Sequence, residues 1–185
     1  MIRYFRIILQ FWKAALIQAM EYRGSFLLGI FANALDFFFG FVQYSLFFTV
    51  AETIAGWETH QMLTFYGIFM TVFSLHFIFL YPNLEAINQL VNTGQLDLVL
   101  TKPFSSQFLL SFRRLSFEEL GSFLAAQSLL LMLVLTGHLH LSPGRVAGFC
   151  VALFVSFAIV YSVFLCFLAL GIWLERLDNM ADLLW

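Results

Sequence analysis

Two ionisable side chains lie inside long apolar stretches of this sequence, and they are the residues best placed to do chemistry. Asp36 lies near the middle of the apolar run 25–50, and His76 lies near the inner end of the run 62–81. An ionisable group within a membrane is costly and usually faces protein or water. Asp36 could line a cavity or make a polar contact between helices. A hydrogen bond to a neighbouring span is the simpler interpretation and is favoured, because no substrate is evident.

For His76, a structural hydrogen bond is favoured over a proton relay, because no acid lies near it in the sequence. His138 and His140 stand in a turn-like stretch, and a shared metal would need further ligands that are not evident. Cys150 and Cys166 lie in one apolar run, about 24 Å apart along a helix, which is too far for a disulfide. An intramembrane enzyme or proton-coupled carrier built on Asp36 and His76 is therefore the least favoured hypothesis.

Motifs for nucleotide or metal chemistry are absent from the sequence. It contains no phosphate-binding loop with Lys and Ser or Thr, no His-Glu-x-x-His, no paired-cysteine metal motif and no Gly-x-Ser-x-Gly. We therefore predict no catalytic residue, no metal site and no cofactor in this chain. If the protein does work on a substrate, the energy must come from a partner.

The composition is that of an integral membrane protein. Hydrophobic residues make up 62% of the chain, aromatic residues 19% and charged residues only 11%, whereas about a quarter of a soluble domain is charged. Nothing supports nucleic-acid binding. Because the apolar runs have the length of membrane spans, we predict an all-α polytopic membrane protein.

We expect a single transmembrane domain over residues 1–185, with an interfacial amphipathic helix followed by four spans. Basic and apolar residues alternate at helical spacing in residues 3–23, a pattern typical of a helix in the lipid headgroup region, although a plain basic flank of the first span is an alternative. Ser116 and Glu119 have capping-box spacing, which places the start of the third span near Phe117. The four spans are expected at 25–50, 62–81, 117–136 and 145–173.

The distribution of basic residues predicts the orientation. Of the nine Lys and Arg residues, only Arg145 falls on the opposite side of the expected spans. The positive-inside rule therefore places both ends and the loop 82–116 in the cytoplasm. The eight residues on this side are Arg3, Arg6, Lys13, Arg23, Lys102, Arg113, Arg114 and Arg176.

The loop 82–116 is the largest polar segment between the apolar runs, which makes it the natural docking surface. We expect Pro82 to close the second span and to start a short amphipathic helix. Gly94 is placed to end that helix in the left-handed conformation, and an extended arm then runs to Lys102 and Pro103. The apolar stripe of the helix consists of Leu84, Ile87, Leu90 and Val91.

This loop resembles the bacterial type 2 ABC transporter permeases. The pattern in that family is approximately Ile, a small gap, Gly-x-Leu-Asp, a short apolar run, and then Lys or Arg followed by Pro. The order of entry helix, two spans, loop and two further spans is also similar, so the resemblance covers essentially the whole chain. The matching residues are Ile87, Gly94, Leu96, Asp97, Leu100, Lys102 and Pro103.

The resemblance implies the transmembrane subunit of an ATP-driven exporter in the bacterial cytoplasmic membrane. Such a subunit works as a homo- or heterodimer with a second permease, and separate cytoplasmic ATP-binding subunits bind the ATP and Mg²⁺. The loop helix would dock on the ATPase as a coupling element. The residues that this implies for docking are Leu84, Ile87, Leu90, Gly94, Leu96, Asp97, Lys102 and Pro103.

Family members continue through two further spans, so we expect this chain to correspond to the first part of a six-span exporter fold. The alternative from another functional class is a membrane scaffold or assembly protein, with the loop as a passive binding surface. Nucleotide-dependent movement of the spans would distinguish the two.

Overall fold

A computed structural model describes residues 2–50, 53–54, 56–94, 101, 110 and 113–174. The contacts divide the chain into two groups, and each is described here by itself. We call Ala19–Ile78 with Phe117–Val151 the α2–α7 group. We call Met1–Gln18, Phe79–Ser116 and Ala152–Trp185 the α4–α8 group.

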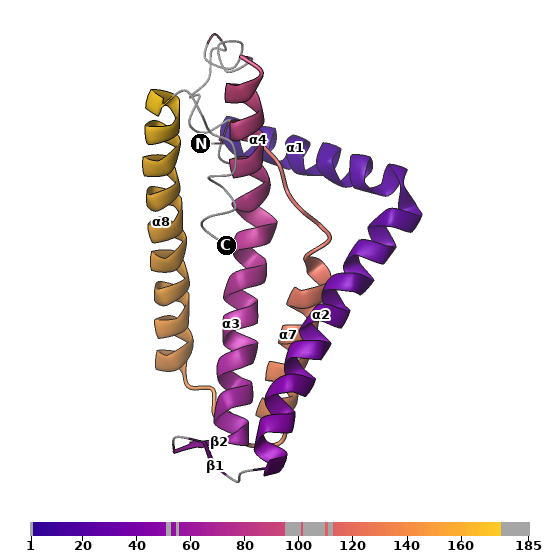
Figure 1. Cartoon of the computed structure of the whole chain (residues 1–185), viewed down its shortest axis with the longest axis vertical. Helices are drawn as coiled ribbons and strands as arrows, with labels where there is room; N and C mark the ends of the chain where they lie inside the picture. The colour runs from indigo at the N-terminus through magenta and orange to yellow at the C-terminus, as the bar shows by residue number, and fades with distance from the viewer. Residues whose placement is uncertain are drawn as a thin grey trace. The chain divides into compact units, whose positions relative to one another are not determined.

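Helices make up almost all of the described chain (Figure 1). The six helices that the structure describes are α1 (Ile2–Glu21), α2 (Arg23–Val50), α3 (Thr59–Phe79), α4 (Tyr81–Asn92), α7 (Leu120–Leu135) and α8 (Pro143–Leu174). Two short strands, β1 (Thr53–Ile54) and β2 (Trp57–Glu58), pair in antiparallel register between α2 and α3.

Three helical stretches are long and apolar enough to cross a membrane: Arg23–Val50, Thr59–Ile87 and Pro143–Cys166. The fourth apolar helix, α7, has 16 residues and is therefore about 24 Å long, somewhat less than the roughly 30 Å of the hydrocarbon layer. The structure thus agrees with a polytopic helical membrane protein. The count of four spans and their topology stay predictions.

The helix α1 occupies the place of the expected interfacial helix. Its apolar side chains Leu9, Leu16 and Met20 are exposed, and Lys13 lies among them on the same side. Trp12 packs against Phe79 with 5.7 Å between ring centroids. An exposed apolar face beside a basic side chain suits the headgroup region of a membrane, so that location remains our prediction.

The helices α2 and α7 lie side by side (Figure 1), and their backbones come close together at Gly121. A Cβ atom at this position would overlap the carbonyl oxygen of Ile30 and would lie 2.9 Å from the backbone nitrogen of Ala34. Next to it, the hydroxyl of Ser122 donates to the carbonyl of Asn33 over 3.0 Å. Small residues let helix backbones meet in this way in membranes, where contact area and hydrogen bonds replace the hydrophobic effect.

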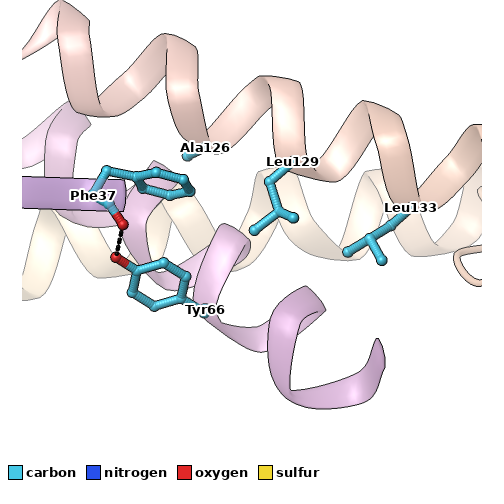
Figure 2. Close-up of a cluster of buried hydrophobic side chains, with 5 residues drawn as sticks. All are labelled: Phe37, Tyr66, Ala126, Leu129 and Leu133. Carbon is cyan, nitrogen blue, oxygen red and sulfur yellow. Dashed lines mark hydrogen bonds between the residues drawn. The ribbon is translucent and has the colours of Figure 1, made fainter. Parts of the chain in front are cut away.

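Further along the same helices lies a buried cluster of five side chains (Figure 2). The rings of Phe37 and Tyr66 stack with centroids 5.1 Å apart, and the Tyr66 hydroxyl donates to the Phe37 carbonyl over 2.8 Å. Ala126, Leu129 and Leu133 of α7 pack against them. The cluster therefore joins α2, α3 and α7 into one packed unit.

The second span and the loop helix are separated by fewer residues than we expected from the position of Pro82. Only Leu80 stands between α3 and α4, and Pro82 is the second residue of α4. The backbone N–H groups of Asn83 and Leu84 donate to the Leu80 carbonyl. Proline is tolerated in the first turn of a helix because its missing N–H would have no partner there, so the chain turns and immediately resumes a helix.

The expected capping box at Ser116 is not formed. The residue that precedes α7 is Glu119, it has helical backbone angles, and no side chain caps the helix. The N–H groups of Leu120 and Gly121 instead donate to the carbonyls of Phe117 and Glu118. A tight turn thus satisfies these donors, and the helix begins three residues later than Phe117.

The β1–β2 hairpin was not predicted from the sequence. Gly56 lies between the strands with φ of +81°, a conformation that glycine adopts without strain. Thr53, Ile54 and Trp57 favour extended backbone. This local pattern could have predicted the hairpin.

Replacing Gly121 by Ala should force α7 away from α2, because the new methyl group would meet backbone atoms that cannot move independently. We expect a loss of about 1–3 kcal/mol in stability, as for other overpacked sites, seen as a lower midpoint of thermal unfolding in detergent. Gly148→Ala in α8 is the matched control, since nothing lies within 4 Å of its added Cβ. Equal midpoints for the two variants would contradict the close approach.

Candidate docking helix and polar face of α2

The helix α4 ends where the sequence predicted. Its last residue is Asn92, and Gly94 follows with φ of +68° in the left-handed region. The hydroxyl and the backbone N–H of Thr93 both donate to the Gln89 carbonyl. These contacts give the helix a defined end ahead of the polar arm.

One side of α4 is buried within the chain. Leu84 is 3% exposed and Ile87 is 4% exposed, and both cluster with Leu80 and with Phe164 of α8. Leu84 and Ile87, which we predicted as docking residues, pack here against the chain's own helix, and their contact with a partner stays a prediction. Their role in this arrangement is to attach α4 to α8.

The other side of α4 is open. Glu85, Gln89 and Thr93 are exposed along it, and the Gln89 amide lies 3.5 Å from the Glu85 carboxylate. Leu90 is half-buried between the two sides. A partner that approaches α4 therefore meets polar side chains first, which sequence reasoning missed because it followed the apolar stripe.

The remaining predicted docking residues cannot be placed. Leu96, Asp97, Lys102 and Pro103 lie outside the described residues. Their assignment to the docking surface stays a prediction from the family pattern. The geometry of the site thus rests on α4 and on the segment around Arg114.

Asn83 connects the two ends of the loop. Its side chain is 1% exposed, and its Nδ2 donates to the carbonyls of Phe79 over 2.7 Å and of Arg114 over 2.9 Å. The backbone N–H of Arg114 donates back to Asn83 Oδ1 over 2.8 Å. The amide therefore bridges the start of α4 and the return segment, a role that the sequence alone did not reveal.

Asp36 lies on an exposed part of α2. Within the part of the chain that the structure describes, it makes no hydrogen bond and no ion pair. The hydrogen bond to a neighbouring span that we favoured from the sequence is therefore not present among these residues. Asp36 has 13 residues of α2 before it and 14 after it, which is the middle of the span.

Further polar or small residues share this side of α2. Asn33, Asp36, Gly40 and Gln43 follow one another at steps of three, four and three residues, so they lie on one helical face. Asn33 and Gly40 are half-buried, and Gln43 is exposed. An added Cβ at Gly40 would overlap the Tyr66 hydroxyl. The polar face therefore borders the packed contacts of α2 with α3.

Two acids stand next to this face at the start of α7. The Glu118 side chain crosses α2 at Gly29, where an added Cβ would lie 2.9 Å from the Glu118 Cγ. Glu119 is the next residue and directly precedes α7. Glu118 therefore lies about two helical turns before Asp36 along α2, and Glu119 adjoins it in the chain.

His76, His138 and the hydroxyl of Thr71 make contacts with other parts of the helices. His76 is 3% exposed, and its Nδ1 lies 2.7 Å from the Val72 carbonyl, which agrees with the structural hydrogen bond that we expected. Gln127 donates to the Thr71 hydroxyl over 2.8 Å and joins α7 to α3. His138 stacks on His60 with centroids 5.1 Å apart.

Replacing Asn83 by Ala would remove three hydrogen bonds and leave two part-buried carbonyls and one part-buried N–H without these partners. We expect stability to fall by about 2–4 kcal/mol at roughly 1 kcal/mol for each bond, and protease cleavage within 84–113 to accelerate. Gln89→Ala is the matched control on the exposed side of the same helix, where we expect a change within about 0.5 kcal/mol. A similar unfolding midpoint in both variants would exclude the bridging role.

Comparison with known families identifies the chain at the level of its sequence. The family model described as ABC-2 family transporter protein matches residues 33–184, which run from within α2 through α8 and include the polar loop. Neither the curated proteins nor the solved structures gave a match. The family match covers well over half of the chain and agrees with the resemblance in the loop, and the chain therefore belongs to the ABC-2 transporter family of multi-pass membrane permeases.

Proposed function

We propose that this chain is the transmembrane subunit of an ATP-driven exporter and that a separate cytoplasmic ATPase docks on α4 and the arm that follows it. Family membership supports a permease of an ABC transporter. The observation that favours docking at this place is the two-sided character of α4. One side is held by Phe164 of α8, and the other side presents Glu85 and Gln89.

The attachment of α4 suits a coupling element. A helix that is anchored at its sides and ends moves as a body, whereas a flexible loop would absorb a displacement of the partner. Leu84 and Ile87 connect α4 to α8, and Asn83 connects it to Arg114. When the ATPase closes on ATP, the push on α4 passes directly to α8.

The direction of transport and the membrane in which it takes place are inferred from the distribution of basic residues and from the family resemblance. Eight of the nine basic residues lie on the side of the loop, which supports a cytoplasmic loop and export across a bacterial cytoplasmic membrane. A second permease subunit would complete the complex. ATP and Mg²⁺ would be bound by the ATPase and not by this chain.

The docking surface is tested by reversing one exposed charge. Glu85→Arg should lower the amount of ATPase that co-purifies with the permease by about threefold or more, because a rim charge influences association with a complementary partner. Glu21→Arg is the matched control, since it makes the same change at an exposed position of α1. Equal recovery of the ATPase with both variants would place the docking surface elsewhere.

The end of the coupling helix is tested at Gly94. An alanine there has open space around it but must adopt positive φ, which costs about 1–2 kcal/mol and should shift the arm that follows. We expect substrate-stimulated ATP hydrolysis by the complex to fall, while the ATPase still co-purifies. Gly24→Ala, also in open space but within helix α2, should leave the hydrolysis rate unchanged. An unchanged rate in Gly94→Ala would argue for a passive scaffold.

A further inference from the structure

Asp36 and Gln43 on the polar face of α2 have no polar partner among the described residues, whereas Asn33 and Gly40 of the same face pack against Ser122 and Tyr66. Asp36 and Gln43 are exposed seven residues apart on one side of the helix, and neither makes a hydrogen bond within the described part of the chain. Two helical turns, or about 10 Å, separate them. A polar strip at the middle of a membrane span requires a polar environment.

Lipid does not provide that environment. A carboxylate at the centre of the hydrocarbon layer is strongly disfavoured, and Asp36 is too short to reach the headgroups, which lie roughly 20 Å away along the helix in either direction. The neighbours of Asp36 on the other sides of α2 are apolar and suit lipid. Leu35, Phe38 and Phe39 are 38%, 54% and 67% exposed.

A second copy of this chain does not supply a counter-charge either. In a two-fold dimer whose axis is normal to the membrane, Asp36 of one copy lies at the same depth as Asp36 of the other. None of the nine Lys and Arg residues lies in the interior of a long apolar run. Contact between the copies alone would therefore bring two carboxylates together with no basic partner.

The acidic side chains around this face determine the sign of the charge on a group that binds there. Glu118 lies against Gly29, two helical turns before Asp36 on the same side of α2. Glu119 follows it directly before α7. A low-dielectric surface with several acids concentrates cations and excludes anions.

We propose that the exposed edge of this α2 face, formed by Asp36 and Gln43, lines a hydrated path through the membrane, and that Asp36 contacts a positively charged group of the cargo. The inference rests on the proposed exporter function. The cargo class is an organic cation, such as a compound with an ammonium or guanidinium group. Asp36 pairs with this group midway through the membrane, and the acids at the start of α7 attract it.

Cysteine labelling tests the hydrated path. The two native cysteines, Cys150 and Cys166, are exposed and are first replaced by Ala. Ala32→Cys then places a thiol one turn before Asp36 on an exposed position of α2, with little change in size. The labelling is carried out in membrane vesicles that contain the complete complex. A cationic methanethiosulfonate reagent should modify this thiol in at least one of two states, with ATP or without it.

Phe38→Cys is the matched control for depth. It is two residues beyond Asp36, about 200° around the helix, and its side chain is 54% exposed on the apolar side. We expect it to react at least about tenfold more slowly than Ala32→Cys, since hydrocarbon excludes the charged reagent and suppresses the thiolate. Equal reactivity at both positions, or none at Ala32→Cys in either nucleotide state, would overturn the path.

The preference for cations is tested separately, by comparing the labelling rates of a cationic and an anionic reagent. The cationic reagent should modify Ala32→Cys about tenfold faster than an anionic reagent of the same chemistry, and Asp36→Asn should remove most of this difference. Tetraethylammonium should slow the labelling only when Asp36 is present. Equal rates for the two reagents would overturn the cation assignment. Co-purification of the ATPase is measured in the same samples, so that a failure of the proposed function is recognised separately.

Discussion

The contact between α2 and α7 at Gly121 determines how closely the helices of the α2–α7 group can pack. Within a membrane the apolar side chains gain little by leaving lipid for protein, so helices associate through close contact and hydrogen bonds. Gly121 removes the side chain that would separate the two backbones. The Ser122 hydrogen bond to Asn33 and the contacts of Ala126 with Phe37 and Tyr66 depend on this approach.

The α4–α8 group is held together by different contacts. Phe164 provides an apolar surface for Leu84 and Ile87, and the buried amide of Asn83 supplies both donors and an acceptor to backbone groups. A buried amide is favourable only when its hydrogen bonds are satisfied. The start of α4 is therefore specified by chemistry and not by helix propensity alone.

Patterns that depend on local physics were predictable from the sequence. The apolar runs predicted α2, α3 and α8, and Gly94 predicted the end of α4 because a left-handed residue there favours glycine. Family resemblance in the loop agreed with the family match over residues 33–184. Chemistry that depends on which residues meet was less accessible. The sequence gives no indication that Asn83 lies beside Arg114 or that Leu84 turns toward Phe164, because these contacts join positions far apart in the chain.

Because of the Asn83 bridge, the length of the loop can change without moving the helices that flank it. Because the chain's own hydrogen bonds hold residues 83 and 114 together, the stretch between them closes on itself and its ends do not shift when its contents change. The entropy of closing a loop rises slowly with length, by about 0.6 kcal/mol for each doubling. With the proposed docking of an ATPase at this loop, insertions or substitutions in this stretch would alter which ATPase binds while the flanking helices keep their register, so that partner choice and helix packing can evolve independently.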